Sequence, residues 1–216
     1  MKDIILLGAG GHCKSVIDSI ENTGEFNIIG ILDKDDKNKD KNISKYKILG
    51  SDVLLQKLYN KGIKNAFICL AGDNNGFLRK KLYNMAKDIG FEFPVIKDKT
   101  ALVSKNSIIE EGVFVGKGAV VNSDSYIGKN TIINTKAVIE HDVKIGEYCH
   151  IAPGAVLCGE VNVKPHCLIG ANSTVIPMKN IDENSIISAG AVIIKDVLKN
   201  SVIVGNPGRS LWKKYI

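Results

Sequence analysis

The feature that most constrains the fold is a strict six-residue period of aliphatic residues in the second half of the chain. Sixteen positions stepped by six, from Val103 to Ile193, all hold Val, Ile or Leu. Two residues before each of them stands a smaller residue, and Lys179 is the one departure from that rule. A period of six fits neither an α-helix, which has about 3.6 residues per turn, nor an alternating strand.

The period is typical of a triangular parallel β-helix in which each flat side takes one hexapeptide. The aliphatic residue then points into the core, the smaller residue packs at a corner, and like residues stack eighteen apart on coils separated by about 4.8 Å. Sixteen hexads predict a little over five coils. Cys149 and Cys167 are eighteen apart, so we expect them to be packing residues. Glycines are expected to supply the turns, at Gly112, Gly116, Gly118, Gly128, Gly146, Gly154, Gly159, Gly170 and Gly190.

The first hundred residues instead alternate short apolar runs with amphipathic helices. The pattern predicts strands over 4–7, 27–32 and 66–70 and helices over 14–21 and 77–89. Such alternation favours a small parallel sheet with covering helices. We therefore expect a Rossmann-like α/β domain over 1–98, followed by a β-helical domain over 99–216. The segment 34–47, dense in Lys, Asp and Asn, is expected to be a surface loop.

The first predicted strand runs into Gly8-Ala9-Gly10-Gly11-His12, which is similar to a dinucleotide-binding turn except that Cys13 replaces its third glycine. Backbone amides at such a turn can hold a phosphate at a helix N-terminus. Asp33, at the end of the second predicted strand, is placed to accept a hydrogen bond from a ribose or a base. A tight turn without any ligand explains these residues equally well on the pattern alone.

Composition narrows the class of protein. The formal charge of +6 favours phosphate-bearing ligands, but no basic stripe interleaved with aromatics points to nucleic acid. No apolar run approaches the roughly 20 residues of a membrane span, and no secretory signal is evident. The five cysteines match no zinc or redox spacing, so we expect reduced thiols in a cytoplasmic protein.

Together these features resemble the hexapeptide-repeat acyltransferases. Within that family they resemble the nucleotide-linked amino-sugar N-acetyltransferases of bacterial glycan synthesis and the related sialic acid O-acetyltransferases. The resemblance covers nearly the whole chain and rests on the glycine turn, the Asp33 strand end, the coils and four motifs. These are Gly72-Asp73-Asn74, Arg79-Lys80-Lys81, Val204-Gly205-Asn206-Pro207-Gly208-Arg209 and, most specifically, Asn134-Thr135-Lys136-Ala137-Val138-Ile139-Glu140-His141-Asp142 with His150 nine residues after His141.

The resemblance implies a left-handed β-helix and a homotrimer, with acetyl-CoA as co-substrate in the cleft between neighbouring β-helices. No metal is expected. The resemblance also implies that the N-terminal domain holds the UDP part of an amino sugar. The implied substrate-binding residues are Gly8, Gly10, Gly11, His12, Asp33, Lys34, Gly72 and Asn134, and the implied acetyl-CoA contacts are His150, Gly159, Asn206 and Pro207. The family often has Glu directly after the catalytic His, where this chain has Asp142.

Acetyl transfer requires a base, a donor that stabilises the oxyanion, and both substrates held together. His141 is the predicted base because the ordinary pKa of histidine, about 6.5, lies near working pH. It follows the inward Ile139 by two positions and so lies at an outer corner of a coil. Asp142 or Glu140 would fix its tautomer, and backbone amides near Gly159 are the predicted oxyanion donors. We expect direct attack in a ternary complex.

Three other activities are alternatives to amino-sugar N-acetylation. The first is O-acetylation of a sialic acid, without a UDP handle. The second is a zinc-dependent hydratase, which the pattern disfavours because His141, His150 and His166 occupy different hexad positions and project in different directions. His166 is instead expected at the surface. The third is a binding module without catalysis. An acyl-cysteine route through Cys158 is disfavoured because no base is implied beside it.

Overall fold

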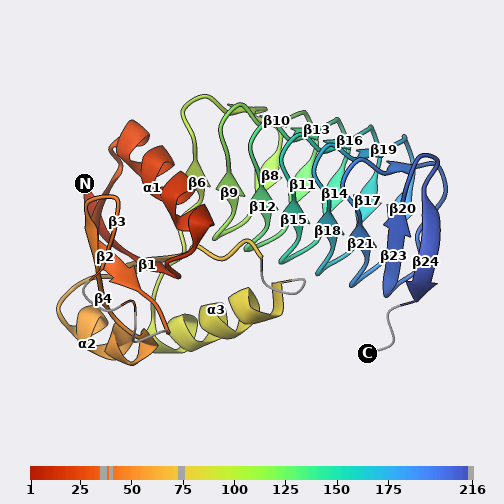
Figure 1. Cartoon of the computed structure of the whole chain (residues 1–216). Coiled ribbons are helices and arrows are strands. Elements are labelled where there is room, and N and C mark those ends of the chain that lie inside the picture. Colours follow the sequence, from red (N-terminus) through yellow and green to blue (C-terminus); the bar gives the residue numbers. More distant parts are fainter. Residues whose placement is uncertain (35–37, 39–40, 73–75, 214–216) are drawn as a thin grey trace.

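The computed structural model describes residues 1–34, 38, 41–72 and 76–213, with the side chains of residues 212 and 213 outside the description. An α/β domain lies against one end of a long β-helix, and the C-terminal strands lie at the opposite end (Figure 1). No helix in these ranges has the length and hydrophobicity of a membrane span.

The N-terminal domain is built on a five-stranded sheet in the order β3-β4-β2-β1-β5. All of its pairings are parallel except that of β3 with β4. The strands are β1 (Lys2–Leu7), β2 (Phe26–Leu32), β3 (Asn42–Ile43), β4 (Tyr46–Gly50) and β5 (Asn65–Ile68). The helices are α1 (Gly11–Thr23), η2 (Asp52–Leu54), α2 (Leu55–Asn60) and α3 (Phe77–Ile89).

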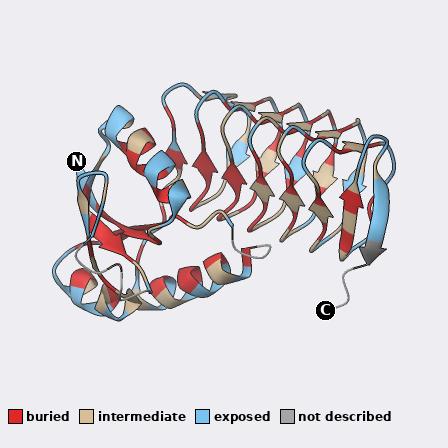
Figure 2. Cartoon of the chain, in the orientation of Figure 1, coloured by how far each residue is buried: buried red, intermediate tan, exposed pale blue. Residues whose placement is uncertain are grey.

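The two faces of this sheet are covered differently. Ile4 and Leu6 of β1 pack with α1, whereas the alternate residues Ile5 and Leu7 pack with α2 and α3. The core beneath α1 also contains Phe114 of the β-helix. α1 therefore packs against both the sheet and the first coils, and buried and exposed residues alternate along the helix (Figure 2).

Each of the sixteen predicted aliphatics ends a two-residue strand, and like strands stack eighteen residues apart in three parallel faces. The prediction of a β-helix is confirmed. The first face contains β6 (Ile96–Lys97), β9 (Phe114–Val115), β12 (Ile132–Ile133), β15 (His150–Ile151), β18 (Leu168–Ile169), β21 (Ile186–Ile187), β23 (Ser201–Val204) and the antiparallel β24 (Arg209–Lys213). The second face contains β7 (Leu102–Val103), β10 (Val120–Val121), β13 (Val138–Ile139), β16 (Val156–Leu157), β19 (Thr174–Val175) and β22 (Val192–Ile193). The third face contains β8 (Ile108–Ile109), β11 (Tyr126–Ile127), β14 (Lys144–Ile145), β17 (Asn162–Val163) and β20 (Asn180–Ile181).

The corners correct one expectation about glycine. Every sixth residue from 112 to 190 has a positive φ, between 54° and 70°, but only four of these fourteen residues are glycine. The other glycines of the coils serve close stacking: a Cβ at Gly170 would lie 2.5 Å from the Ala189 nitrogen of the next coil. Glycine is thus used for left-handed corners at some positions and for contact between coils at others.

In the N-terminal domain the predicted strands and helices are present with shifted ends, and one expectation is wrong. The segment 34–47 is not simply a loop, because β3 and the start of β4 lie within it. Ile48 of β4 is 2% exposed and belongs to the core beneath α1, so the sheet extends beyond β2 by two strands that were not expected, β4 and β3. Helix α2 was not predicted either.

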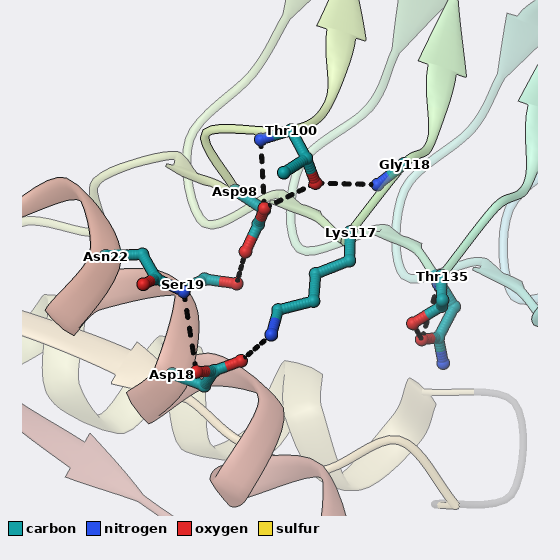
Figure 3. A network of polar contacts seen from close by, with 9 residues as sticks. Asp18, Ser19, Asn22, Asp98, Thr100, Lys117, Gly118 and Thr135 are labelled. Carbon is teal, nitrogen blue, oxygen red and sulfur yellow. Dashed lines mark hydrogen bonds and ion pairs between the residues drawn. The ribbon is translucent and has the colours of Figure 1, made fainter.

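Polar contacts fasten α1 to the first coil (Figure 3). The buried Asp98 carboxylate accepts hydrogen bonds from the Ser19 hydroxyl at 2.8 Å and from the Thr100 nitrogen and hydroxyl at 3.0 and 2.7 Å. At the surface beside them, Lys117 forms an ion pair with Asp18. The placement of α1, which begins at the glycine turn, is therefore linked to the β-helix.

Candidate active site

The glycine turn after β1 depends on two close contacts. Gly8 has a φ of +104°, and a Cβ there would lie 2.6 Å from Leu70 Cδ2. The backbone N–H of Ala9 donates a hydrogen bond of 2.8 Å to the Asp33 carboxylate. Gly10, at the N-cap of α1, provides no side-chain cap, and a Cβ at this position would meet no atom within 4 Å. The start of α1 thus has the room and the backbone donors to receive a phosphate.

Two adjacent hollows flank this turn and share the lining residues Leu70 and Leu78, and we refer to the two together as the cleft. The first has a volume of about 90 Å³ and the second about 280 Å³. The first hollow is lined by Gly8, Leu32, Asp33, Lys34, Asp52, Leu70, Leu78 and Leu82. The second hollow is lined by Gly10, Gly11, His12, Cys69, Leu70, Ala71, Gly72 and Leu78. The structure therefore brings seven of the eight predicted substrate-binding residues to this cleft, while Asp73 and Asn74 lie outside the described residues.

Asp52 lines the first hollow and was not predicted. It opens η2, directly after β4. Burial, together with the nearby charge of Asp33, raises the pKa of the Asp52 carboxyl. No signal in the sequence pointed to it, because the strand β4 that precedes it was not predicted.

Asn134, the eighth predicted substrate-binding residue, lies on the β-helix against His150. The Asn134 side-chain oxygen accepts a hydrogen bond from the Thr135 nitrogen at 2.8 Å, which leaves its amide nitrogen 3.1 Å from His150 Nε2. With Asn134 as the donor, His150 Nε2 is the acceptor and the ring is neutral. Burial, followed by the charge of Arg79, lowers the pKa of His150 to about 4.

His12 extends the same cluster from the glycine turn. Its ring meets Phe114 edge to face, with the centroids 4.9 Å apart. Burial, then the charges of His150 and Arg79, lower the pKa of His12 to about 4. His12 Nε2 is buried and forms no hydrogen bond with any other described residue. It is therefore an unused polar atom beside the second hollow.

His141 lies elsewhere, at the corner between the second and third faces. Its Nδ1 is 2.9 Å from the Asp142 carboxylate, and about 60% of the His141 side chain is exposed. The hydrogen bond to Asp142 and the charges of Asp142, Glu140 and Glu160 raise the pKa of His141. A proton on Nδ1 leaves the lone pair on Nε2, as a general base requires.

The His141 ring rests on the backbone of Gly159, one coil further on. A Cβ at position 159 would lie 2.6 Å from His141 Cε1 and 2.7 Å from Nε2. Gly159 therefore leaves the space that the imidazole occupies. Asp142, which has a φ of 60°, occupies the left-handed corner position, and this conformation turns its carboxylate toward the ring.

A groove of about 500 Å³ opens beside this corner on the third face. We call it the third-face groove, and it is lined by Asp142, Lys144, Glu160, Val161, Asn162 and Asn180. Its lining carries both charges, and it begins at the residue that holds His141. The groove therefore adjoins Asp142, while His141 itself is not among the residues that line it.

Glu140 and Cys158 stack on adjacent coils of the second face. Glu140 accepts a hydrogen bond from the Asn122 amide at 3.0 Å, whereas Asp142 is the carboxylate bonded to His141. Burial, followed by the charge of Glu140, raises the pKa of the Cys158 thiol. A thiol held in its protonated form is a poor nucleophile, which weakens the acyl-cysteine route.

Asn206 and Pro207 lie exposed in the turn between β23 and β24. Gly208, next to them, donates a backbone hydrogen bond to Val192 of the second face at 2.7 Å. The strand that precedes His141 and the strand that contains Val192 are three coils apart, which corresponds to roughly 14 Å along the β-helix.

The predicted site residues therefore gather in separate places on one chain: the cleft with Asn134 and His150, the corner with His141, and the distal C-terminal turn. Within the described ranges, no group of three or more His, Cys, Asp or Glu side chains is arranged to hold a metal ion. His166, expected at the surface, instead stacks on Phe77 and Tyr148, with ring centroids 4.6 and 5.3 Å away.

Comparisons with known proteins match both halves of the chain. The PglD N-terminal domain matches residues 3–86, and bacterial transferase hexapeptide repeats match residues 106–141, 124–159 and 142–177. No curated protein matches the chain.

Among solved structures, perosamine N-acetyltransferase from Caulobacter crescentus, a histidine-to-asparagine variant with CoA and GDP-perosamine, is 32% identical over 97% of each chain, with a TM-score of 0.92. The acetyltransferase domain of PglB from Neisseria gonorrhoeae, with acetyl coenzyme A, is 28% identical over 97% of this chain and 99% of that one, with a TM-score of 0.89. WeeI from Acinetobacter baumannii, at 24% identity over 98% of this chain and 100% of that one, shares the fold with a TM-score of 0.84.

Proposed function

The chain belongs to the hexapeptide-repeat acyltransferases, and from that premise we propose that it acetylates the amino group of a UDP-linked amino sugar with acetyl-CoA. The reaction would serve the assembly of a bacterial glycan in the cytoplasm. The observation that carries the proposal is the position of His141. Its ring rests on Gly159 and is bonded to Asp142, which lines an open groove.

The cleft of the N-terminal domain supports a nucleotide sugar as the acceptor. Its glycine turn offers backbone donors for a diphosphate, and the carboxylates of Asp33 and Asp52 line the smaller hollow. These carboxylates can accept hydrogen bonds from the N–H groups of a base or the hydroxyl groups of a ribose. The sugar would then extend into the larger hollow toward His12, whose buried Nε2 can bind a polar group.

In the proposed reaction, His141 Nε2 accepts a proton as the amine nitrogen attacks the thioester carbonyl carbon. The oxyanion of the tetrahedral intermediate receives a hydrogen bond from the Gly159 N–H, which donates to no other backbone group among the described residues. The C–S bond then breaks, and the departing CoA thiolate takes the proton from His141. The acetylated amine and free CoA are the products, and no enzyme-bound acetyl group is formed.

Acetyl-CoA would lie along the outer edge of the β-helix, from His141 toward Asn206 and Pro207. The separation of roughly 14 Å between those coils suits the extended pantetheine arm of the coenzyme. His150 lies in the cluster with His12 and Asn134, and we propose that it contacts the acetyl or pantetheine end from that side.

We propose a homotrimer in which the base and the acceptor cleft come from neighbouring chains. The separation of His141 from the glycine turn within one chain supports this arrangement. A cyclic trimer places the same two unlike surfaces together at each of its interfaces.

The function is tested by following free thiol release with acetyl-CoA and a panel of UDP- and GDP-linked 3-amino and 4-amino sugars. We expect turnover with a UDP-linked amine, and loss of that turnover in His141→Ala with nucleotide binding retained. Turnover only with GDP-linked amines would overturn the UDP assignment alone. Turnover of sialic acid, with none of any amine, would overturn the acceptor class.

A further inference from the structure

Arginine is rare in this chain, and one of its two arginines is buried where the two domains meet. Of the 29 Lys and Arg residues only Arg79 and Arg209 are arginine, and Arg79 is 2% exposed. Its Nη1 donates a hydrogen bond to the Leu70 carbonyl at 3.1 Å. Its Nη2 donates to the carbonyls of Tyr148 and Cys149 at 2.6 and 3.4 Å.

These bonds explain why arginine, not lysine, occupies the position. A guanidinium is planar and donates in several fixed directions, whereas an ammonium is a compact point charge. Burying a charge is costly unless it is hydrogen-bonded. Here the guanidinium group donates to two segments of the chain at once. Its acceptors are backbone carbonyls, which cannot move by rotation of a side chain.

The guanidinium group of Arg79 links the cleft of the N-terminal domain to the coil that carries His150. Leu70 lines both hollows of the cleft, and the residues after it, Ala71 and Gly72, line the second hollow. Tyr148 and Cys149 directly precede His150 on the β-helix. The guanidinium therefore sets the separation between the wall of the cleft and the coil that carries His150.

The contacts around Arg79 restrict the distance between α3 and the β-helix. A Cβ at Gly76, at the N-cap of α3, would lie 2.5 Å from the Tyr148 carbonyl oxygen, so the backbones approach closely. Phe77 stacks on His166 with an interplanar angle of 11°, and His166 stacks on Tyr148 with an angle of 6°. The first turn of α3 is thus packed closely against the β-helix.

We propose that Arg79 is a positioning residue for the acceptor sugar, holding the Leu70 segment and the coil before His150 at the separation that the bound sugar spans. This inference rests on the proposed function. Burial is the main cause of the lowered pKa of His12 and His150, and the charge of Arg79 adds to it, so both rings are neutral and His150 can accept the hydrogen bond from Asn134. Arg79 contacts no reacting atom in this scheme.

The test compares Arg79→Met and Arg79→Lys with Lys87→Met, a control on the same helix. Lys87 also joins α3 to the β-helix, through an exposed ion pair with Glu111 at 2.7 Å, but lines neither hollow. We expect Arg79→Met to raise the KM for the acceptor at least tenfold and the KM for acetyl-CoA by clearly less, because His150 is the one residue of the displaced coil that is proposed to contact the coenzyme. Arg79→Lys should recover part of the loss, and Lys87→Met should leave both KM values unchanged.

Chemical rescue separates positioning from a general loss of folding. In Arg79→Ala, added guanidinium ion should restore acceptor KM, whereas an equal concentration of sodium chloride should not. An unchanged acceptor KM in Arg79→Met would overturn the inference. Equal increases in the KM of both substrates that guanidinium ion does not reverse would overturn it as well. The kinetics use whichever acceptor, amine or hydroxyl, the wild type acetylates fastest, so a wrong acceptor class is seen in the wild type and not confused with the role of Arg79.

Discussion

Gly159 determines where the His141 ring can lie. The same hexad position, two after the inward aliphatic, holds Ala171 and Ala189 in other coils, so the backbone there accepts a methyl group. At position 159 the methyl group would instead collide with His141 Cε1 and Nε2. The requirement for glycine therefore comes from the imidazole and not from the coil.

Gly159→Ala is accordingly expected to lower kcat/KM about 100-fold, because the displaced ring no longer presents Nε2 to the acceptor. The measurement is thiol release under subsaturating acceptor. Urea unfolding of Gly159→Ala alone and in a His141→Ala background supplies the control. The substitution should cost less stability when the ring is absent, and an equal cost in both backgrounds would show that the clash is with something else.

The Asp142 carboxylate affects both the orientation and the proton affinity of His141. It is the largest of the influences that raise the pKa of His141, and a base must be unprotonated to act. In Asp142→Asn that pKa falls, so the acidic limb of the kcat/KM profile moves to lower pH. We also expect kcat at the plateau to fall 10- to 100-fold, because the amide no longer favours the proton on Nδ1. A profile whose acidic limb does not move would mean that another group controls it, and Glu140→Gln is the comparison variant.

At the scale of elements, a strand or helix could be predicted when its own residues carried a regular pattern. The coils were predicted position by position because each hexad repeats the same inward residue, independently of the rest of the chain. β4 and α2 were missed because they are short and carry no regular period. The left-handed corners at Gly112, Gly118, Gly154 and Gly190 were predicted, whereas the other ten were missed because they are not glycine.

The candidate site shows the same division. His141 and the glycine turn could be found from a local motif, whereas the surroundings of Asp52 and Arg79 depend on which segments are brought together by folding. A buried arginine looks like a surface residue in the sequence, since Lys80 and Lys81 follow it directly. Only the docking of α3 on the β-helix shows which of the three is enclosed.

The attachment of α1 to the first coil depends on a buried carboxylate, and its loss has a defined expected cost. Burial alone would raise the pKa of Asp98, but hydrogen bonds from Thr100 and Ser19 lower it. Asp98→Asn presents an amide N–H₂ toward some of these donors, so we expect a loss of about 2 kcal/mol in the free energy of unfolding. Urea denaturation at equal protein concentration measures it.

Asp18→Asn provides the matched control for Asp98→Asn. Asp18 lies next to Ser19 on the same helix, and its carboxylate pairs with Lys117 at the surface (Figure 3). An exposed ion pair contributes little to stability, so this variant should unfold nearly as the wild type does. Equal losses in the two variants would mean that charge, and not the buried network, holds α1 in place.

At the scale of the whole molecule, the two domains are attached through separate contacts at α1 and α3. α1 is fixed through Asp98 and the core around Phe114, and α3 through Arg79 and the rings of Tyr148 and His166. Two attachments on opposite faces of the sheet prevent the N-terminal domain from pivoting about either one. The cleft therefore has a set orientation relative to the β-helix, and in a trimer relative to the neighbouring chain.

That arrangement leads to a complementation experiment with two inactive variants. Asp33→Ala removes the partner of the glycine turn but keeps His141, and His141→Ala keeps the cleft but removes the base. If each site combines the cleft of one chain with the His141 of a neighbour, mixed trimers contain sites with both groups intact. At a one-to-one mixture about one quarter of the interfaces join the intact halves, so co-expressed chains should recover roughly a quarter of wild-type activity. If both groups acted within one chain, no mixture would recover activity, and trimers mixed without subunit exchange provide the baseline.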